Sequence, residues 1–155
     1  MTSAVAVAQR FLDLAAAEHK ALTNMQLQKL VFFAHGVYLA GFNEPLIDEP
    51  IRAWDFGPVI PELYERLRHF GRNPVRTELA PELRSVLEHD ERADEAIVAV
   101  WDAYRNHTAF QLSQITHLPN TPWDKIWNQP NGRYEVIPNA IIQQYYRDRV
   151  QRNAA

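Results

Sequence analysis

The residues best suited to metal or acid–base chemistry in this sequence are six histidines, and there is no cysteine to join them. None of the histidines stands in a His-Glu-x-x-His pattern, the helical spacing that binds zinc. His107 and His117 could approach carboxylates such as Asp102 or Asp124, but a buried histidine usually serves as a hydrogen-bonded structural residue. We therefore predict no metal and no cofactor. The alternative hypothesis is an enzyme or small-ligand binder that uses the His117 region, with or without His35 and with or without a metal ion.

Two further patterns carry candidate chemistry. His35 lies in the most apolar stretch of the chain. It is either a core histidine hydrogen-bonded to a neighbouring loop or a general base in a cleft, and the lack of a nearby nucleophile favours the core reading. Asp55-Phe56-Gly57 spells the metal-binding tripeptide of protein kinases, but no glycine-rich loop or His-Arg-Asp catalytic loop accompanies it. We interpret Asp55 as a loop hydrogen-bonding residue and Gly57 as a helix cap.

Several common enzyme and cofactor motifs are missing from the sequence. The sequence contains no P-loop, no dinucleotide fingerprint and no Gly-x-Ser-x-Gly motif. It has four tryptophans, which we expect mostly in the core, although exposed tryptophan and tyrosine are also typical anchors of protein interfaces. The net charge of -3 argues against sequence-independent binding of nucleic acid, so we do not expect direct nucleic-acid binding.

The length and composition predict one globular domain that spans residues 1–155. With 155 residues, 46% of them hydrophobic and 23% charged, the chain resembles an ordinary soluble protein with a self-sufficient core. The absence of cysteine fits a reducing compartment. The apolar N-terminal stretch lacks a basic leader, so we do not expect a signal peptide.

The element around which the chain is organised is a predicted helix over residues 23–41. Thr23 and Gln26 form a capping-box pattern at its start, and Gly41 suits a left-handed stop at its end. Apolar residues cover nearly all of its faces, which predicts a buried central helix. A membrane span needs about 20 nearly uninterrupted apolar residues. Polar residues such as Lys29 and His35 interrupt this stretch, so we expect no membrane insertion.

The remaining elements are predicted to pack around this central helix. In the first helix, residues 4–18, Gln9 and Asp13 are expected on the side opposite the apolar residues. Gly57-Pro58 is expected to open another helix, because proline is tolerated in a first turn. Further helices are predicted to begin near residues 81, 90, 108, 121 and 138. We therefore predict a mainly α, compact helical bundle with a small two-stranded β element formed by residues 51–55 and 133–137.

Two groups of short motifs resemble one known family. The first group lies in residues 27–71 and the second in residues 112–123. Together they comprise Leu27-x-Lys29-Leu30, Pro45-Leu46, the Ala-Trp-x-x-Gly-Pro-Val element from Ala53 to Val59, Leu63-Tyr64, Leu112-Ser113-x-x-Thr116-His117 and Pro122-Trp123. Their types and order are similar to those of the Panacea domain, the SocA-like, phage-associated family that also includes GepA-like proteins. The resemblance covers about residues 5–150.

The resemblance implies a role that composition does not show. Such domains are largely helical and cytoplasmic, and they often serve as antitoxins in toxin–antitoxin systems. They neutralise a cognate protein toxin encoded next door by direct protein–protein binding. SocA-like members can act as proteolytic adaptors that deliver the toxin to the ClpXP protease. The family supplies no catalytic residues, and a mobile-element protein that binds a host factor is a further alternative.

We predict that the two motif groups meet in the fold. Both lie where a loop is expected to enter a helix, and residues at such junctions either fix packing or build sites. We hypothesise that they form a groove for the partner, with packing alone as the alternative. The candidate partner-binding residues are Trp54, Asp55, Gly57, Pro58, Tyr64, Thr116, His117 and Trp123.

Overall fold

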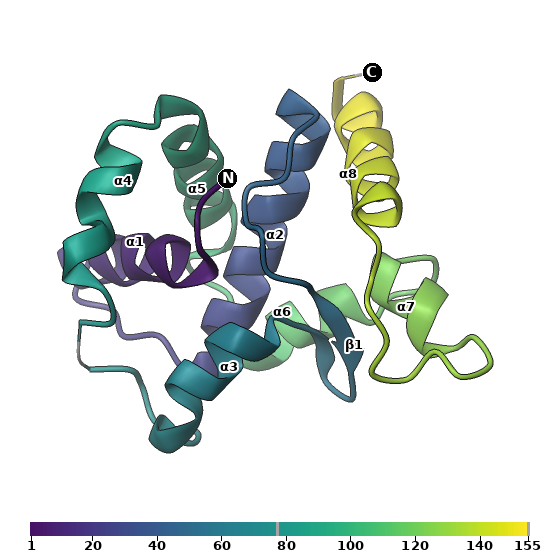
Figure 1. Ribbon diagram of the computed structural model, residues 1–155, viewed down its shortest axis with the longest axis horizontal. Helices are drawn as coiled ribbons and strands as arrows, with labels where there is room; N and C mark the ends of the chain where they lie inside the picture. The colour runs from purple at the N-terminus through teal and green to yellow at the C-terminus, as the bar shows by residue number, and fades with distance from the viewer. Residues whose placement is uncertain (77, 155) are drawn as a thin grey trace.

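The computed structural model describes the backbone of residues 1–76 and 78–154 and the side chains up to Arg149, except for residue 77. This part of the chain is mainly helical, as predicted, with one small antiparallel sheet (Figure 1). The α-helices are α1 (Ala4–Ala17), α2 (Asn24–Phe42), α3 (Pro61–Leu67), α4 (Arg84–Glu88), α5 (Glu91–Tyr104), α6 (Ala109–Thr116), α7 (Pro122–Trp127) and α8 (Asn139–Ala154). The strands are β1 (Arg52–Trp54) and β2 (Gly57–Val59). No helix in the described part of the chain combines the length and apolarity that crossing a bilayer requires.

Helix α2 begins where the sequence predicts. The Thr23 backbone amide donates to Gln26 Oε1 at 2.9 Å, and the Gln26 amide donates to Thr23 Oγ1 at 3.3 Å, which completes the capping box. The predicted stop at Gly41 is wrong, because the helix runs to Phe42 and Asn43 adopts the left-handed conformation, with φ of 58°. Asparagine tolerates this conformation. Here its side-chain oxygen also accepts a hydrogen bond at 2.7 Å from Gln143 of α8.

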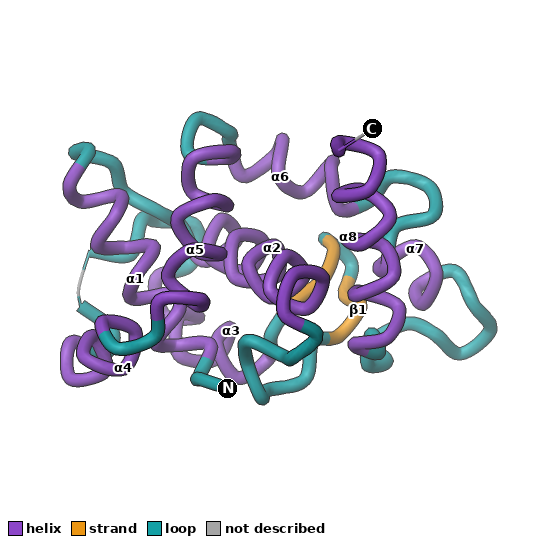
Figure 2. The backbone as a smooth tube through the Cα atoms, turned by 90° about the horizontal axis from the view of Figure 1, so that it is seen from above, coloured by secondary structure: helices purple, strands orange, loops and turns teal. Residues whose placement is uncertain are grey.

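The central helix is buried on nearly all sides, as expected from its sequence. Figure 2 shows α2 in the middle of the molecule, with α5 on one side and α8 on the other. Phe33 of α2 stacks on Tyr104 of α5 at 4.6 Å between ring centroids. On the opposite side, Gly36 lets the ring of Tyr146 approach, since an added Cβ would lie 2.3 Å from that ring. A residue larger than glycine would therefore force α2 and α8 apart.

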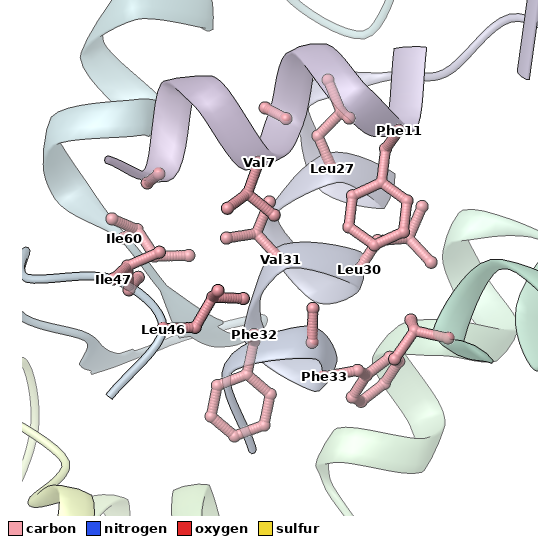
Figure 3. Packing of buried hydrophobic residues seen from close by; sticks show 14 of the residues in the cluster. Val7, Phe11, Leu27, Leu30, Val31, Phe32, Phe33, Leu46, Ile47 and Ile60 are labelled. Carbon is pink, nitrogen blue, oxygen red and sulfur yellow. The ribbon is translucent and has the colours of Figure 1, made fainter. Parts of the chain in front are cut away.

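Helix α1 and the loop after α2 complete the core. In Figure 3, Val7 and Phe11 of α1 lie against Leu27 and Val31 of α2. The fully buried side chains there include Phe11, Leu27, Leu30, Leu46, Ile47 and Ile60. This continuous apolar contact is the main source of stability for a fold of this size.

Gln9 does not lie on the exposed side of α1, where the sequence had placed it. It is buried, and its Oε1 accepts hydrogen bonds from the backbone amides of Leu79 at 2.7 Å and Ala80 at 2.9 Å. Its amide nitrogen donates to Asp13 at 3.0 Å. The reason is that the segment before α4 has backbone amides which need a partner when they are buried against α1.

The sheet differs from the predicted one in its second strand. Strand β1 pairs in antiparallel register with β2, so that Arg52, Ala53 and Trp54 face Val59, Pro58 and Gly57 respectively. The prediction that Gly57-Pro58 opens a helix is therefore wrong, and α3 begins only at Pro61. Gly57, with φ of 113°, allows the tight reversal of the chain after the Asp55-Phe56 turn.

Residues 133–137 do lie beside residues 51–55, as predicted, but they form a single bridge rather than a strand. The Ala53 amide donates to Glu135 at 3.0 Å, and the Tyr134 amide donates to Ala53 at 2.8 Å. The Ile137 amide donates to Ile51 at 2.8 Å. These bonds occupy the edge of β1 that β2 leaves open, which protects it from unwanted strand pairing.

Candidate functional site

The two motif groups of the sequence meet at the β1–β2 hairpin. The indole N–H of Trp123 on α7 donates to the Trp54 carbonyl at 2.7 Å. The Ser113 hydroxyl on α6 donates to the Phe56 carbonyl at 3.1 Å. Three successive carbonyls of the hairpin turn thus gain partners from α6, α7 and the residue after α6, because His117 Nε2 lies 3.2 Å from the Asp55 carbonyl. The hairpin is held by side chains more than 50 positions away in the sequence.

His117 holds this arrangement together and is poorly placed for acid–base or metal chemistry. Its Nδ1 lies 2.6 Å from the Ser113 carbonyl, so both ring nitrogens face backbone carbonyl oxygens, which only accept hydrogen bonds. The ring also packs on Trp123 at 4.2 Å between centroids. Neither Asp102 nor Asp124 is its partner. No group of three or more acidic or histidine side chains that could hold a metal ion occurs in the part of the chain that the structure describes.

Gly57 lies where three motif segments converge. A Cβ atom there would come within 2.7 Å of Thr116 Oγ1, and within 3.1 Å of both Cε and Nζ of Lys29. Lys29 comes from the second turn of α2 and Thr116 from the end of α6. Only glycine therefore fits at this position, both for its positive φ and for the space available.

Lys29 is the residue that the sequence analysis missed as a candidate for function. Its side chain is 1% exposed, and its Nζ donates one long hydrogen bond, 3.4 Å, to the Pro58 carbonyl. Burial lowers the pKa of the Lys29 ammonium to about 7. Within the described residues, it pairs with no carboxylate. The available signal was a charged residue on a helix that is apolar on nearly every face, since such a residue has to be buried.

An open groove of about 760 Å³ lies between the start of α2, the hairpin and α3. Aromatic rings form one wall, where Trp54 meets Tyr64 edge-on at 5.2 Å. The Tyr134 hydroxyl donates to the Asp55 carboxylate, which raises the pKa of Tyr134. The charged side chains along the groove are Lys29, Asp55, Arg68 and Arg72.

The predicted site residues fall into two sets around this groove. Trp54, Asp55 and Tyr64 line it. The other five do not line the groove. Gly57 and Pro58 belong to strand β2 of the hairpin, and Thr116, His117 and Trp123 contact the hairpin from the side of α6 and α7. Some motif residues therefore form the wall of the groove, and the others hold the hairpin in place. Their role in partner binding remains a prediction.

Several large apolar side chains are exposed around the same hairpin. They are Phe56 at 67%, Phe110 at 69%, Leu118 at 50%, Tyr134 at 51% and Val136 at 40% exposed, and we call these five residues the hairpin surface. They come from the hairpin turn, from α6 and the loop after it, and from the segment that lies along β1. Exposed apolar groups that gather around one element are typical of an interaction site. The sequence analysis did not find this surface, because the exposure of an apolar side chain depends on the tertiary fold.

His35 is a core histidine, as the simpler interpretation held. Its Nδ1 accepts from the Ile47 amide at 3.3 Å, so Nε2 carries the proton and donates to Asn139 Oδ1 at 2.9 Å. Burial lowers the pKa of His35, against an opposing contribution from the Asn139 hydrogen bond. The residue thus joins α2 to the loop after it and to the start of α8, and it lies outside the groove.

Comparison with known proteins agrees with the motif pattern. The family model described as "Antitoxin SocA-like, Panacea domain" matches residues 27–124, more than half of the chain. The curated protein Antitoxin SocA from Caulobacter vibrioides (strain NA1000 / CB15N) is 34% identical over 132 residues, which cover 81% of this chain and 70% of that protein. No solved structure shows a significant match. The chain therefore belongs to the family of antitoxin SocA-like proteins that carry a Panacea domain.

Proposed function

We propose that this protein is the antitoxin of a toxin–antitoxin pair and that it neutralises a cognate protein toxin by direct binding in the cytoplasm. The observation that carries the proposal is the match, over most of the chain, to a protein named as an antitoxin. Family membership also favours a non-enzymatic role. The arrangement of His117, with both ring nitrogens directed at backbone carbonyls, gives no support to the alternative of an enzyme centred on that residue.

The hairpin surface is the part of the molecule that we propose contacts the toxin. Phe56 and Phe110 are each more than two thirds exposed, and burial of such aromatic side chains supplies much of the free energy of protein association. The hairpin beneath them is fixed by the Ser113 and Trp123 hydrogen bonds. A rigid support lowers the entropy lost when the surface binds a partner.

The test is co-expression with the product of the small open reading frame next to this gene. We expect that product alone to arrest growth and this chain to restore it. The double variant Phe56→Ser, Phe110→Ser should lose the rescue while it remains folded, because both side chains are exposed. Val86→Ser is the matched control, since Val86 is an exposed apolar residue of α4, outside the hairpin surface.

The outcomes separate the hypotheses. Growth arrest that co-expression leaves unchanged would refute the toxin-neutralising role and favour a protein that binds a host factor. Rescue that survives the double variant would refute the hairpin surface as the contact and leave the antitoxin role intact.

We include the proteolytic adaptor role, which the family resemblance implies, as a second step of this proposal. If the chain hands the toxin to a ClpXP-type protease, the half-life of the toxin after synthesis stops should shorten when this chain is present. That shortening should disappear in cells without the protease. An unchanged half-life, together with full rescue, would reduce the mechanism to occlusion of the toxin by binding.

A further inference from the structure

We propose that the groove beside the hairpin receives a toxin segment in which an acidic side chain follows an aromatic or aliphatic one, and that Lys29 at its floor binds the carboxylate. This inference rests on the proposed function, because it names the chemistry of the partner segment that the antitoxin recognises. It adds a specific anchor to the hairpin surface, whose exposed side chains alone would discriminate little between apolar partners.

The charge of the groove is the first argument. The chain as a whole carries a formal net charge of -3. The groove lining, in contrast, contains three basic residues, Lys29, Arg68 and Arg72, against one acidic residue, Asp55. Asp55 accepts a hydrogen bond from the Tyr134 hydroxyl. Arg68 is paired with Glu65 at 3.7 Å, which leaves Lys29 and Arg72 as the basic side chains of the lining that no described carboxylate pairs with. A local excess of positive charge on an otherwise acidic protein attracts an acidic partner segment.

The second argument is the unused hydrogen-bonding capacity of Lys29. An ammonium group has three donors, and the described structure gives it one long bond, 3.4 Å, to the Pro58 carbonyl. A buried charge without a counter-charge is costly, and proteins normally pair it. Removal from water is the cause that lowers the pKa of Lys29. An arriving carboxylate supplies both the missing charge and the missing acceptors.

The third argument is the apolar wall next to this lysine. Met25 from α2, Trp54 from β1, Val59 from β2 and Tyr64 from α3 line the same groove. Aromatic rings that meet edge-on, as Trp54 and Tyr64 do, accept a further aromatic ring at low cost. Wall and floor together fit an apolar residue next to an acidic one, rather than an isolated anion or a purely apolar segment.

Binding should depend on pH in one direction. The titratable groups that share the groove with Lys29 are Asp55 and Tyr134 near the hairpin, Tyr64 and Arg68 on or next to α3, and Arg72 after it. A bound carboxylate holds the proton on Lys29, so the affinity strengthens as pH falls from about 9 towards 7. The change is at most about tenfold per pH unit for one coupled proton, and it levels off below the pKa of the free protein.

The test uses two short peptides and needs no toxin. Binding of acetyl-Phe-Glu-amide and of acetyl-Phe-Gln-amide to the full chain is followed by NMR at the Trp54 indole, at pH 7 and pH 9. The two peptides differ only in the charge of one side chain. We expect the glutamate peptide to bind at least tenfold more tightly at pH 7, and the difference to shrink at pH 9.

Two variants complete the design. Lys29→Met should remove the preference for glutamate, and Lys125→Met should keep it, because Lys125 is an exposed lysine of α7 outside the groove. Equal affinity of the two peptides for the wild-type chain, or no binding of either, would overturn the inference. A glutamate preference that Lys29→Met retains would overturn it as well, and the pH dependence of the wild type tests it even where the variant is poorly folded.

Failure here is distinguishable from failure of the antitoxin role. Growth rescue with no peptide discrimination refutes the Lys29 anchor alone. Peptide discrimination without growth rescue shows that the groove binds acidic segments but refutes a toxin as their source.

Discussion

Replacing Lys29 by methionine should stabilise the free protein, and the gain should depend on pH. Methionine has nearly the same length and volume and no charge to bury. The replaced ammonium group is 1% exposed and lies among the residues where α2 meets the hairpin. The perturbation therefore removes a desolvated charge and leaves the packing around it almost unchanged.

The magnitude follows from the pKa of Lys29, which burial lowers from its ordinary 10.5 to about 7. Each pKa unit corresponds to about 1.36 kcal/mol, so at pH 7 the buried lysine costs the fold about 4 kcal/mol, and at pH 9 about 2 kcal/mol. Loss of the long hydrogen bond to the Pro58 carbonyl offsets the gain by about 1 kcal/mol. Lys29→Met should then raise the free energy of unfolding by about 3 kcal/mol at pH 7 and about 1 kcal/mol at pH 9.

The sign can be checked from proton binding. Between pH 7 and 10.5 the unfolded chain binds the lysine proton while the folded chain releases it, so the stability of the wild type rises with pH through this window. The variant lacks this contribution. Urea unfolding at pH 7 and pH 9 measures the difference in free energy of unfolding between Lys29→Met and wild type, with Lys125→Met as an exposed-lysine control. A stability difference that is the same at both pH values would refute the reasoning. So would a Lys29→Met variant that is less stable than wild type at both.

Three smaller predictions concern the packing of α2 and the hairpin. Gly36→Ala should lower the free energy of unfolding by about 1–3 kcal/mol, because the methyl group meets the ring of Tyr146; Gly41→Ala, with nothing within 4 Å of its Cβ, should raise it by about 0.5–1 kcal/mol. Gly57→Ala should lower urea stability by about 1–3 kcal/mol through its positive φ, and a neutral result would argue against the hairpin geometry. For His35→Gln, the stability lost relative to wild type should shrink as pH falls from 7.5 to 5. Below pH 6.5 the unfolded wild-type chain binds a proton at His35, whereas the folded chain does not, because burial lowers the pKa of His35. The wild type therefore loses stability that the glutamine variant keeps, and thermal melting at both pH values measures the difference.

The parts of the fold that the sequence predicted correctly are those that local chemistry decides. The helix starts at Thr23, Thr108 and Thr121 were all predicted from the cap residue, and in each the hydroxyl accepts a hydrogen bond from an amide three residues on. A helix cap can be predicted in this way because its hydrogen bond joins residues within a single helical turn. The burial of α2 could also be predicted, because a helix that is apolar on nearly all faces has only one stable environment.

The errors lie where distant residues decide between local alternatives. Gly41 and Asn43 are both acceptable ends for α2, and the hydrogen bond from Gln143, a hundred residues further along, accompanies the second choice. Gly57-Pro58 would suit a helix start equally well. The hairpin prevails because Trp123 and Ser113 bind its turn carbonyls, and no window of the sequence around Gly57 contains that information.

The candidate site also combines features that local sequence predicts with features that distant residues decide. The two motif groups meet at the hairpin, as predicted, but the sequence could not show which of their residues line the groove and which support the hairpin. Lys29 was used in the sequence analysis as a motif residue and as an argument against a membrane span, but it also carried a further signal. A cation on a helix that is apolar on nearly all faces has to be buried, and a buried cation requires a partner. Within the described chain the partner is a single long bond to the Pro58 carbonyl. The imbalance between the cost of burying Lys29 and this weak compensation is the physical reason to look for its counter-charge on another molecule.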